Sequence, residues 1–196
     1  MSRTFTLVDG PSVDDLVTYL GRAQRVEDGS VRLIAGSGIL AAYTAILYPS
    51  GLLDSGPTVL GLRTFALRGA VEFDAVVPMR SLLERLERAR EATPDGYVPV
   101  GVPTEVSTVT WAGISPPKGG WKLVGETSAG ILEEAGRAGI AAVADALPDG
   151  TGEQIVRRVR GEIWARPIEG LEHVPAGVGF AGIGLGFLGD PEERIP

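Results

Sequence analysis

Apolar residues recur every three to four positions in several stretches of the chain, which is the spacing of an amphipathic helix. The clearest stretch is 80–92, whose buried stripe we expect to consist of Leu82, Leu83, Leu86 and Ala89. The same spacing predicts helices over about 13–25, from Thr127 or Ser128 to about Leu147, and from Thr151 to Pro167. We expect Ser12 to cap the first of these helices and Thr151 with Gln154 to form a capping box at the last.

Small residues form a stripe along the predicted helix that ends near Leu147. Its members are Ala135, Gly136, Gly139 and Val143. The stripe predicts that a neighbouring element approaches this helix closely.

Short runs rich in β-branched and aromatic residues predict strands. These runs are Thr4–Val8, Val31–Ala35, Ile39–Tyr48, Thr58–Arg68, Val71–Val77, Glu105–Trp111 and Trp121–Val124. We expect one hairpin to turn at Gly36–Gly38 and a second at Gly69–Ala70.

The second hairpin has a predicted register. A two-residue turn would place one set of side chains on the core face, namely Leu60, Leu62, Ala66, Phe73 and Val77. The opposite face would then carry Arg63, Phe65, Leu67, Glu72 and Asp74. A one-residue slip would exchange the two faces.

The glycine-rich tail 176–188 fits two structures. At period two it is a strand with one bare face. At period 3.6 it is a helix with Phe180, Ile183 and Phe187 together, although each interior glycine costs a helix about 0.8–1 kcal/mol relative to alanine.

These elements predict an α+β fold. We expect a mainly antiparallel sheet of five or more strands, with helices on one face and a C-terminal helical part. The Pro/Gly-rich stretch 93–103 suggests an N-terminal lobe at 1–93 and a C-terminal lobe at 104–196 packed on it, although 1–196 as one domain also fits the length.

The amino-acid composition limits the kinds of functional site that the chain can form. The chain of 196 residues has a formal net charge of −7, no cysteine and one histidine. These counts argue against disulfides, thiol nucleophiles, zinc fingers and any metal site that needs two imidazoles. The acidic balance argues against a general nucleic-acid or anionic-membrane surface. We therefore expect no cofactor, no bound metal and a cytoplasmic protein.

Two glycine and serine motifs have simple structural explanations. Gly36-Ser37-Gly38-Ile39-Leu40-Ala41 matches a dinucleotide-binding fingerprint, but no carboxylate follows at the expected distance, so we expect a turn. Ser128 and His173 could belong to a nucleophilic triad, but a helix cap and a surface residue explain them more simply.

Six residues are candidates for a binding site. Arg63 lies in an apolar strand and needs a partner, for which the predicted register offers Asp74. Trp111, Lys118 and Trp121 surround a proline-stiffened loop, and rigid aromatics with a cation are typical of binding surfaces. Glu126 precedes a predicted helix, where it suits the helix dipole or carboxylate chemistry.

Four segments resemble a family of conserved actinobacterial proteins without an assigned activity. They are GLLDSGPTVLGLRTFAL (51–67), the VEFDAVVP strand with its helix (71–92), WAGISPPKGGWKLVGE (111–126) and PAGVGFAGIGLGFL (175–188). The resemblance implies a stand-alone soluble protein and favours a helix in the tail, where relatives are alanine-rich. It implies no cofactor or catalytic residue.

Two functions follow from these observations. We expect a non-catalytic binding or interaction protein, a homodimer that uses the 111–126 region to contact a small molecule or a protein. The alternative is a small-molecule enzyme that uses carboxylate and arginine chemistry around Arg63, Asp74 and Glu126.

Overall fold

The computed structural model describes residues 3–49, 56–92, 97, 99–107, 109–113, 116–117, 119–148 and 150–196, and the statements below concern these residues. The helices are α1 (Gly10–Val26), α2 (Met79–Ala92), η1 (Thr110–Gly113, a 3-10 turn), α3 (Ala129–Ala146), α4 (Glu153–Trp164) and α5 (Gly177–Leu185). The strands are β1 (Thr4–Phe5), β2 (Ser30–Gly36), β3 (Ile39–Leu47), β4 (Val59–Ala66), β5 (Phe73–Pro78), β6 (Val100–Gly101), β7 (Thr127–Ser128), β8 (Pro167–Ile168), β9 (Leu171–Pro175) and β10 (Arg194–Ile195).

The chain divides into two compact units. The first unit contains Met1–Ala45 and Leu60–Gly113, and the second contains Ile46–Val59 and Ile114–Pro196. The predicted α+β class is confirmed, because a four-stranded antiparallel sheet and small two-stranded sheets combine with helices, and α3, α4 and α5 form the C-terminal helical part. In the described residues the main sheet has four strands rather than the five or more that we expected.

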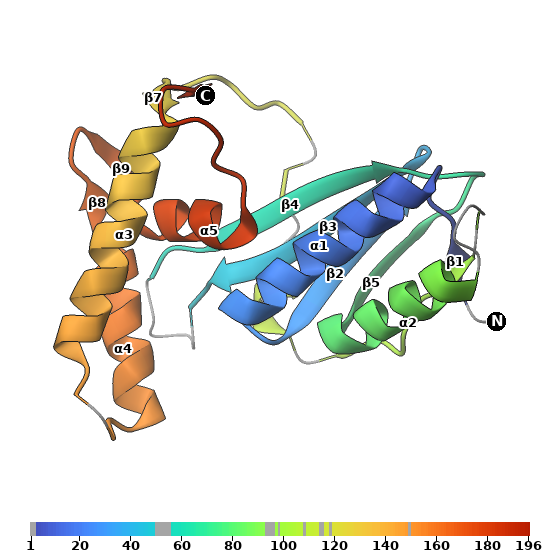
Figure 1. Cartoon of the computed structure of the whole chain (residues 1–196), viewed down its shortest axis with the longest axis horizontal. Helices are drawn as coiled ribbons and strands as arrows, with labels where there is room; N and C mark the ends of the chain where they lie inside the picture. The colour runs from blue at the N-terminus through green and yellow to red at the C-terminus, as the bar shows by residue number, and fades with distance from the viewer. Residues whose placement is uncertain are drawn as a thin grey trace. The chain divides into compact units, whose positions relative to one another are not determined.

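The main sheet has the strand order β4-β3-β2-β5 (Figure 1). Gly36 pairs with Ile39 at the end of the β2–β3 hairpin, and the two residues between them have positive φ, 51° at Ser37 and 77° at Gly38. Two consecutive positive φ angles are the signature of a type I′ turn, whose twist matches that of the strands. The predicted turn at Gly36–Gly38 is therefore confirmed.

Helices α1 and α2 pack side by side on one face of this sheet (Figure 1). The α1 side chain Tyr19 reaches β3, where its hydroxyl lies 2.8 Å from Thr44 Oγ1. Burial raises the pKa of Tyr19 to about 12, because the phenolate would lose its hydration. The predicted stripe of α2 is confirmed at Leu82, Leu83 and Leu86, which are buried.

The cap of α1 differs from the prediction. Asp9, not Ser12, is the N-cap, and its carboxylate accepts a hydrogen bond of 2.8 Å from the Ser12 backbone N–H. This hydrogen bond lowers the pKa of Asp9. The helix begins earlier than predicted because Pro11 fits the first turn, where no backbone N–H is needed.

The predicted β4–β5 hairpin is wrong. The two strands lie at opposite edges of the sheet, because β5 pairs with β2 rather than with β4. The predicted faces of β4 are also exchanged, since Phe65 is 5% exposed whereas Leu62 is 43% exposed. An alternating pattern fixes which residues share a face, but not which strand lies alongside.

Two further predicted strands are absent from the described residues. Segment 105–111 forms no strand there; it carries one backbone bond of 2.9 Å from Val106 N–H to Val76 O and then enters η1. Segment 121–124 has no regular structure. Both runs have the apolar composition of strands, but composition alone supplies no pairing partner.

The second unit is built on close contact between helices. A Cβ placed on Gly136 of α3 would lie 2.7 Å from the backbone carbon of Gly179 in α5. Gly139, one turn further along α3, leaves room for the Trp164 ring, which stacks on Phe180 with centroids 4.4 Å apart. The predicted close approach to the small-residue stripe is thus confirmed, and the tail forms the helix α5.

Of the two predicted caps of the C-terminal helices, the one of α3 is confirmed and the one of α4 is wrong. Ser128 caps α3 by accepting a hydrogen bond of 3.4 Å from the Ile131 N–H, as expected. The capping box at Thr151 is wrong, because Gly152 is the N-cap of α4 and Thr151 Oγ1 donates to the Pro148 carbonyl at 2.6 Å instead.

Candidate binding surface

Arg63 has the ion pair that its apolar strand requires, but with a different partner from the one predicted. Its Nε lies 2.8 Å from Asp15 Oδ2 and its Nη2 lies 2.8 Å from Asp15 Oδ1. Asp15 belongs to α1, so the Arg63 side chain is on the helix-covered face of the sheet. The two parallel contacts form a bidentate pair that fixes the guanidinium in place.

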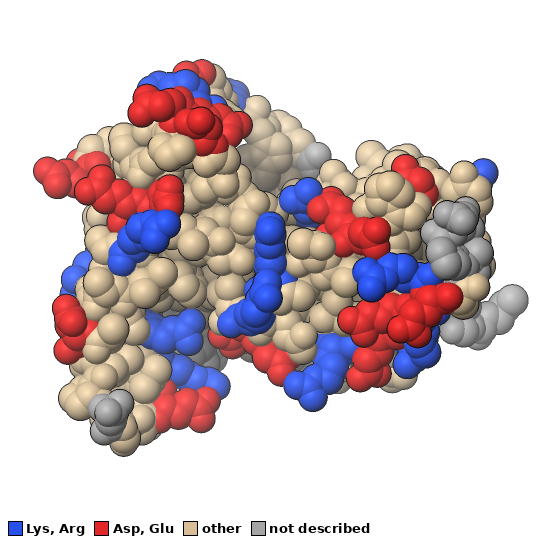
Figure 2. Space-filling view, viewed as in Figure 1, with Lys and Arg blue, Asp and Glu red and all other residues tan. Residues whose placement is uncertain are grey.

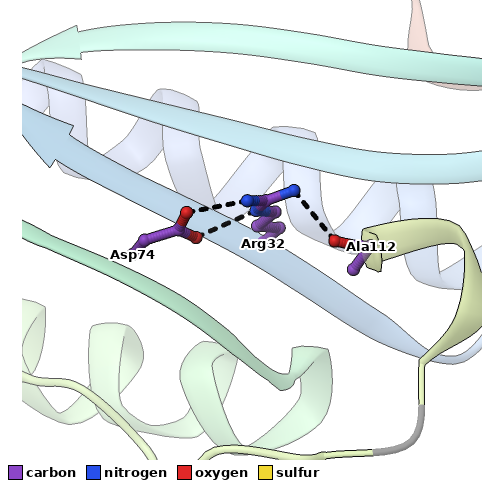
Figure 3. A network of polar contacts seen from close by, with 3 residues as sticks. All are labelled: Arg32, Asp74 and Ala112. Carbon is purple, nitrogen blue, oxygen red and sulfur yellow. Dashed lines mark hydrogen bonds and ion pairs between the residues drawn. The ribbon is translucent and has the colours of Figure 1, made fainter. Parts of the chain in front are cut away.

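Asp74 pairs with Arg32 of β2, as Figure 3 shows. The Arg32 Nε lies 2.9 Å from Asp74 Oδ1, and its Nη2 lies 2.7 Å from Asp74 Oδ2. The Arg32 side chain is only 9% exposed, whereas that of Asp74 is 49% exposed. The hydrogen bonds that Arg32 donates to Asp74 raise the pKa of Arg32, so the guanidinium stays charged.

The third contact of Arg32 fastens a distant segment. Its Nη1 donates to the Ala112 carbonyl of η1 at 2.9 Å (Figure 3). Because Val106 also bonds to the outer edge of β5, the segment before Gly113 is held to the sheet at two places. Trp111, the neighbour of Ala112 in η1, is half-buried.

Residues 119–126 present apolar side chains to solvent. Large apolar side chains are usually buried, yet Trp121 is 75%, Leu123 67% and Val124 81% exposed. Lys118, the predicted cation of this surface, lies outside the described residues. Exposed apolar side chains that lie together in one short segment are typical of an interaction site.

Glu126 lies where this exposed segment enters β7. Its Oε2 is 3.6 Å from Arg194 Nη2, and Arg194 is the first residue of β10, which pairs with β7. Both side chains are at least half exposed, so water screens the pair and its contribution to stability is small. Glu126 therefore lies at the end of the exposed segment, in an ion pair that is open to water.

Arg63 and Asp74, the charged candidates of the first unit, do not meet at one site. Arg63 and Asp74 point to opposite faces of the sheet, and each has its own partner of opposite charge. Glu126 belongs to the second unit. Within the described residues, no group of three or more His, Cys, Asp or Glu side chains is arranged to hold a metal ion.

Surface charge is mixed on the face in Figure 2, where acidic and basic side chains are interspersed. The arginines of α4 follow this pattern, because Arg157 pairs with Glu153 and Arg158 with Glu162 at i,i+4 spacing. No helix in the described part of the chain is long and apolar enough to cross a membrane.

Sequence reasoning missed Arg32, although the signal was present. Arg32 interrupts the apolar run Val31–Ala35 in the same way that Arg63 interrupts its strand. It also missed Leu123 and Val124, because an apolar run with β-branched residues is typical of a buried strand. Exposure of such a run becomes visible only once the neighbouring elements are placed.

Comparison with known proteins adds two family matches. Residues 1–111 match a family model described as "Domain of unknown function (DUF8010)". Residues 116–195 match a second model, described as "Domain of unknown function (DUF8185)". A search of curated proteins and a search of solved structures each gave no match.

Proposed function

We propose that this chain, which belongs to the DUF8010 family through its first 111 residues, is a non-catalytic binding protein whose segment 119–126 contacts a protein partner. The observation that carries the proposal is the exposure of Trp121, Leu123 and Val124. A partner that fully buries Leu123 and Val124 would gain about 1.5–3 kcal/mol for each of these two side chains.

The charged candidates support this proposal over the enzyme alternative. A catalytic carboxylate or guanidinium has to present free atoms to a substrate. Arg63 is engaged with Asp15, and Asp74 is engaged with Arg32. These ion pairs stabilise the fold, whereas Trp121, Leu123 and Val124 are exposed apolar side chains that a partner could cover.

The side chains of segment 119–126 indicate what kind of partner surface would bind it. The apolar side chains alternate with Lys122 and lead to Glu126, both exposed. A complementary surface would offer an apolar groove for Trp121 and Leu123, with polar groups at its rim, which is the usual anatomy of a protein interface. A tryptophan is the residue most suited to dominate such an interface.

Three further features belong to the same proposal. We infer a homodimer, a cytoplasmic location and an actinobacterial origin, the last from the resemblance of segments 51–67, 71–92, 111–126 and 175–188 to proteins of that group. Fractionation of cells that produce the native chain tests the location: recovery with the membrane or outside the cell would contradict it.

A photo-crosslinking experiment tests the binding surface. The full chain carries a benzophenone amino acid in place of Trp121, is produced in its native host and is illuminated in living cells. Tyr97, which is 56% exposed in the first unit, receives the same group as the control. We expect one discrete protein adduct from position 121 and none from position 97.

A second variant makes the result specific. Leu123→Ser with Val124→Ser removes the flanking apolar side chains and keeps the crosslinker at position 121. The adduct should fall at least about tenfold, as expected when an interface loses about 1.4 kcal/mol or more. An adduct that persists, or a pattern identical to that from position 97, contradicts the proposal.

A further inference from the structure

Strand β4 lies at the edge of the main sheet, with β3 as its neighbour on the inner side (Figure 1). The Leu67 N–H donates to the Gly38 carbonyl, toward β3. The next groups point the other way, since Ala66 O accepts from Val8 N–H and Arg68 N–H donates to Thr6 O. Backbone directions alternate along a strand. The N–H and C=O groups of Leu60, Leu62 and Thr64 therefore point outward from the sheet.

This outward edge has no strand beside it in the described part of the chain. Segment 6–8 covers only its far end, at 66–68. Proteins usually protect such an edge with proline, lysine or a bulge. The three outward residues provide none of these, the inward-pointing charge of Arg63 is neutralised by Asp15, and Leu62 is 43% exposed on the sheet face away from α1. The unprotected stretch is short and is centred on Leu62.

We propose that a second copy of this chain pairs with this edge, antiparallel, with the two-fold axis at Leu62. Leu62 then faces Leu62 of the second copy, and Leu60 faces Thr64 at each side. Every outward N–H and C=O of these residues gains a partner, since a two-fold interface supplies each group twice. The two four-stranded sheets become one continuous sheet of two copies.

The charges select this register. With the axis at Leu62, Arg63 faces Gly61 of the second copy, which has no side chain to obstruct it. A shift of the axis by one residue toward Arg63 would place two guanidinium groups opposite each other, which is destabilising. Each Arg63 keeps Asp15 as its own partner. The proposed register is therefore the one that avoids like-charge contact and joins apolar residues.

This inference rests on the homodimer in the proposed function, and it names the surface that forms it. The surface does not include 119–126, so the two proposals fail separately. The triple substitution Trp121→Ser, Leu123→Ser and Val124→Ser should leave the dimer unchanged in native mass spectrometry. Loss of the dimer in that variant would assign the interface to 119–126 and overturn the inference.

The absence of cysteine makes a direct crosslinking test available. In the proposed register the two Leu62 Cα atoms lie about 5.5 Å apart, which is within the range of about 4.4–6.8 Å for a disulfide. Leu62→Cys in the full chain should give a covalent dimer under mild oxidation. Thr64→Cys is the matched control, because its two copies would lie about 14 Å apart along the strands.

A second variant tests the interface without a crosslink. Leu62→Arg puts two like charges at the axis, and the dissociation constant of the dimer should rise at least about tenfold. Ile39→Arg, at an exposed apolar residue of β3 rather than β4, should leave it unchanged. Circular dichroism confirms that each variant is folded. A monomeric native chain, equal crosslinking of both cysteine variants, or a dimer insensitive to Leu62→Arg overturns the inference.

Discussion

Replacing Gly179 by alanine tests whether the contact between α3 and α5 depends on backbone proximity. A Cβ at this position would meet the Leu132 carbonyl oxygen and would lie 2.9 Å from the Gly136 nitrogen. Both atoms belong to the backbone of α3, so neither can rotate away as a side chain would. The added methyl group can fit only if α5 moves away from α3.

Two opposing effects determine the magnitude. Alanine is favoured over glycine inside a helix by about 0.8–1 kcal/mol. Inserting a methyl group into a closely packed contact costs about 1–3 kcal/mol, and more where the neighbours are rigid. We expect the second effect to dominate, with a net loss of about 2 kcal/mol. For a chain of this size, that loss lowers the melting temperature by about 4–8 °C.

Gly161→Ala provides a matched control. Gly161 lies inside α4, and a Cβ there would meet nothing within 4 Å. This substitution should stabilise the protein by about 0.5–1 kcal/mol, because only the helix preference changes. Differential scanning calorimetry of the two variants gives the comparison. If Gly179→Ala melted at or above the temperature of Gly161→Ala, the proposed backbone contact would be refuted.

Three other predictions concern buried polar groups and the exposed segment. Tyr19 has a pKa of about 12 in the folded state and about 10 when unfolded, so the unfolded state releases its proton first. The free energy of unfolding should therefore fall by about 3 kcal/mol in total as the pH rises from about 10 to about 12. Tyr19→Phe should remove this part of the alkaline pH dependence, measured by urea titrations. Asp74→Asn should destabilise the fold by about 1–2 kcal/mol, because Arg32 stays buried without its carboxylate while the exposure of Asp74 limits the loss; an unchanged denaturation midpoint would contradict this. Trp121→Phe should remove the most red-shifted part of the tryptophan fluorescence, because Trp121 is the most exposed of the three tryptophans whereas Trp164 is 2% exposed; a loss of blue-shifted emission instead would show that Trp121 is buried.

The helices and the first hairpin could be predicted because their signals are local. The Leu82–Leu86 stripe, the Ser128 cap and the turn at Ser37–Gly38 all depend on residues within a few positions of one another. The position of β5 could not be predicted in this way. Its pairing with β2 depends on competition between distant strands, and the alternating pattern of Val71–Val77 fits either neighbour.

The candidate site shows the same division between local and distant information. The need of Arg63 for an acidic partner followed from its apolar surroundings, but Asp15 is contributed by a helix that only the fold brings near. Trp121 was predicted as a binding residue, while Leu123 and Val124 have a composition that indicates a buried strand. They are exposed because no strand pairs with this segment in the described residues. The local sequence pattern does not indicate whether such a partner strand is present.

The assignment of residues 46–59 to the second unit has a consequence for dividing the chain. These residues run from the end of β3 to the first residue of β4, so they are encoded within the first unit although they belong to the second. A Cβ on Gly177 would lie 3.1 Å from Leu47 Cδ2, which places Leu47 in the packing around α5. A fragment that starts after Gly113 would therefore lack part of its own core, and a fragment that ends there would carry an orphaned piece of it. No single cut of the chain therefore separates the two units, because 46–59 is inserted in the sequence of the first unit.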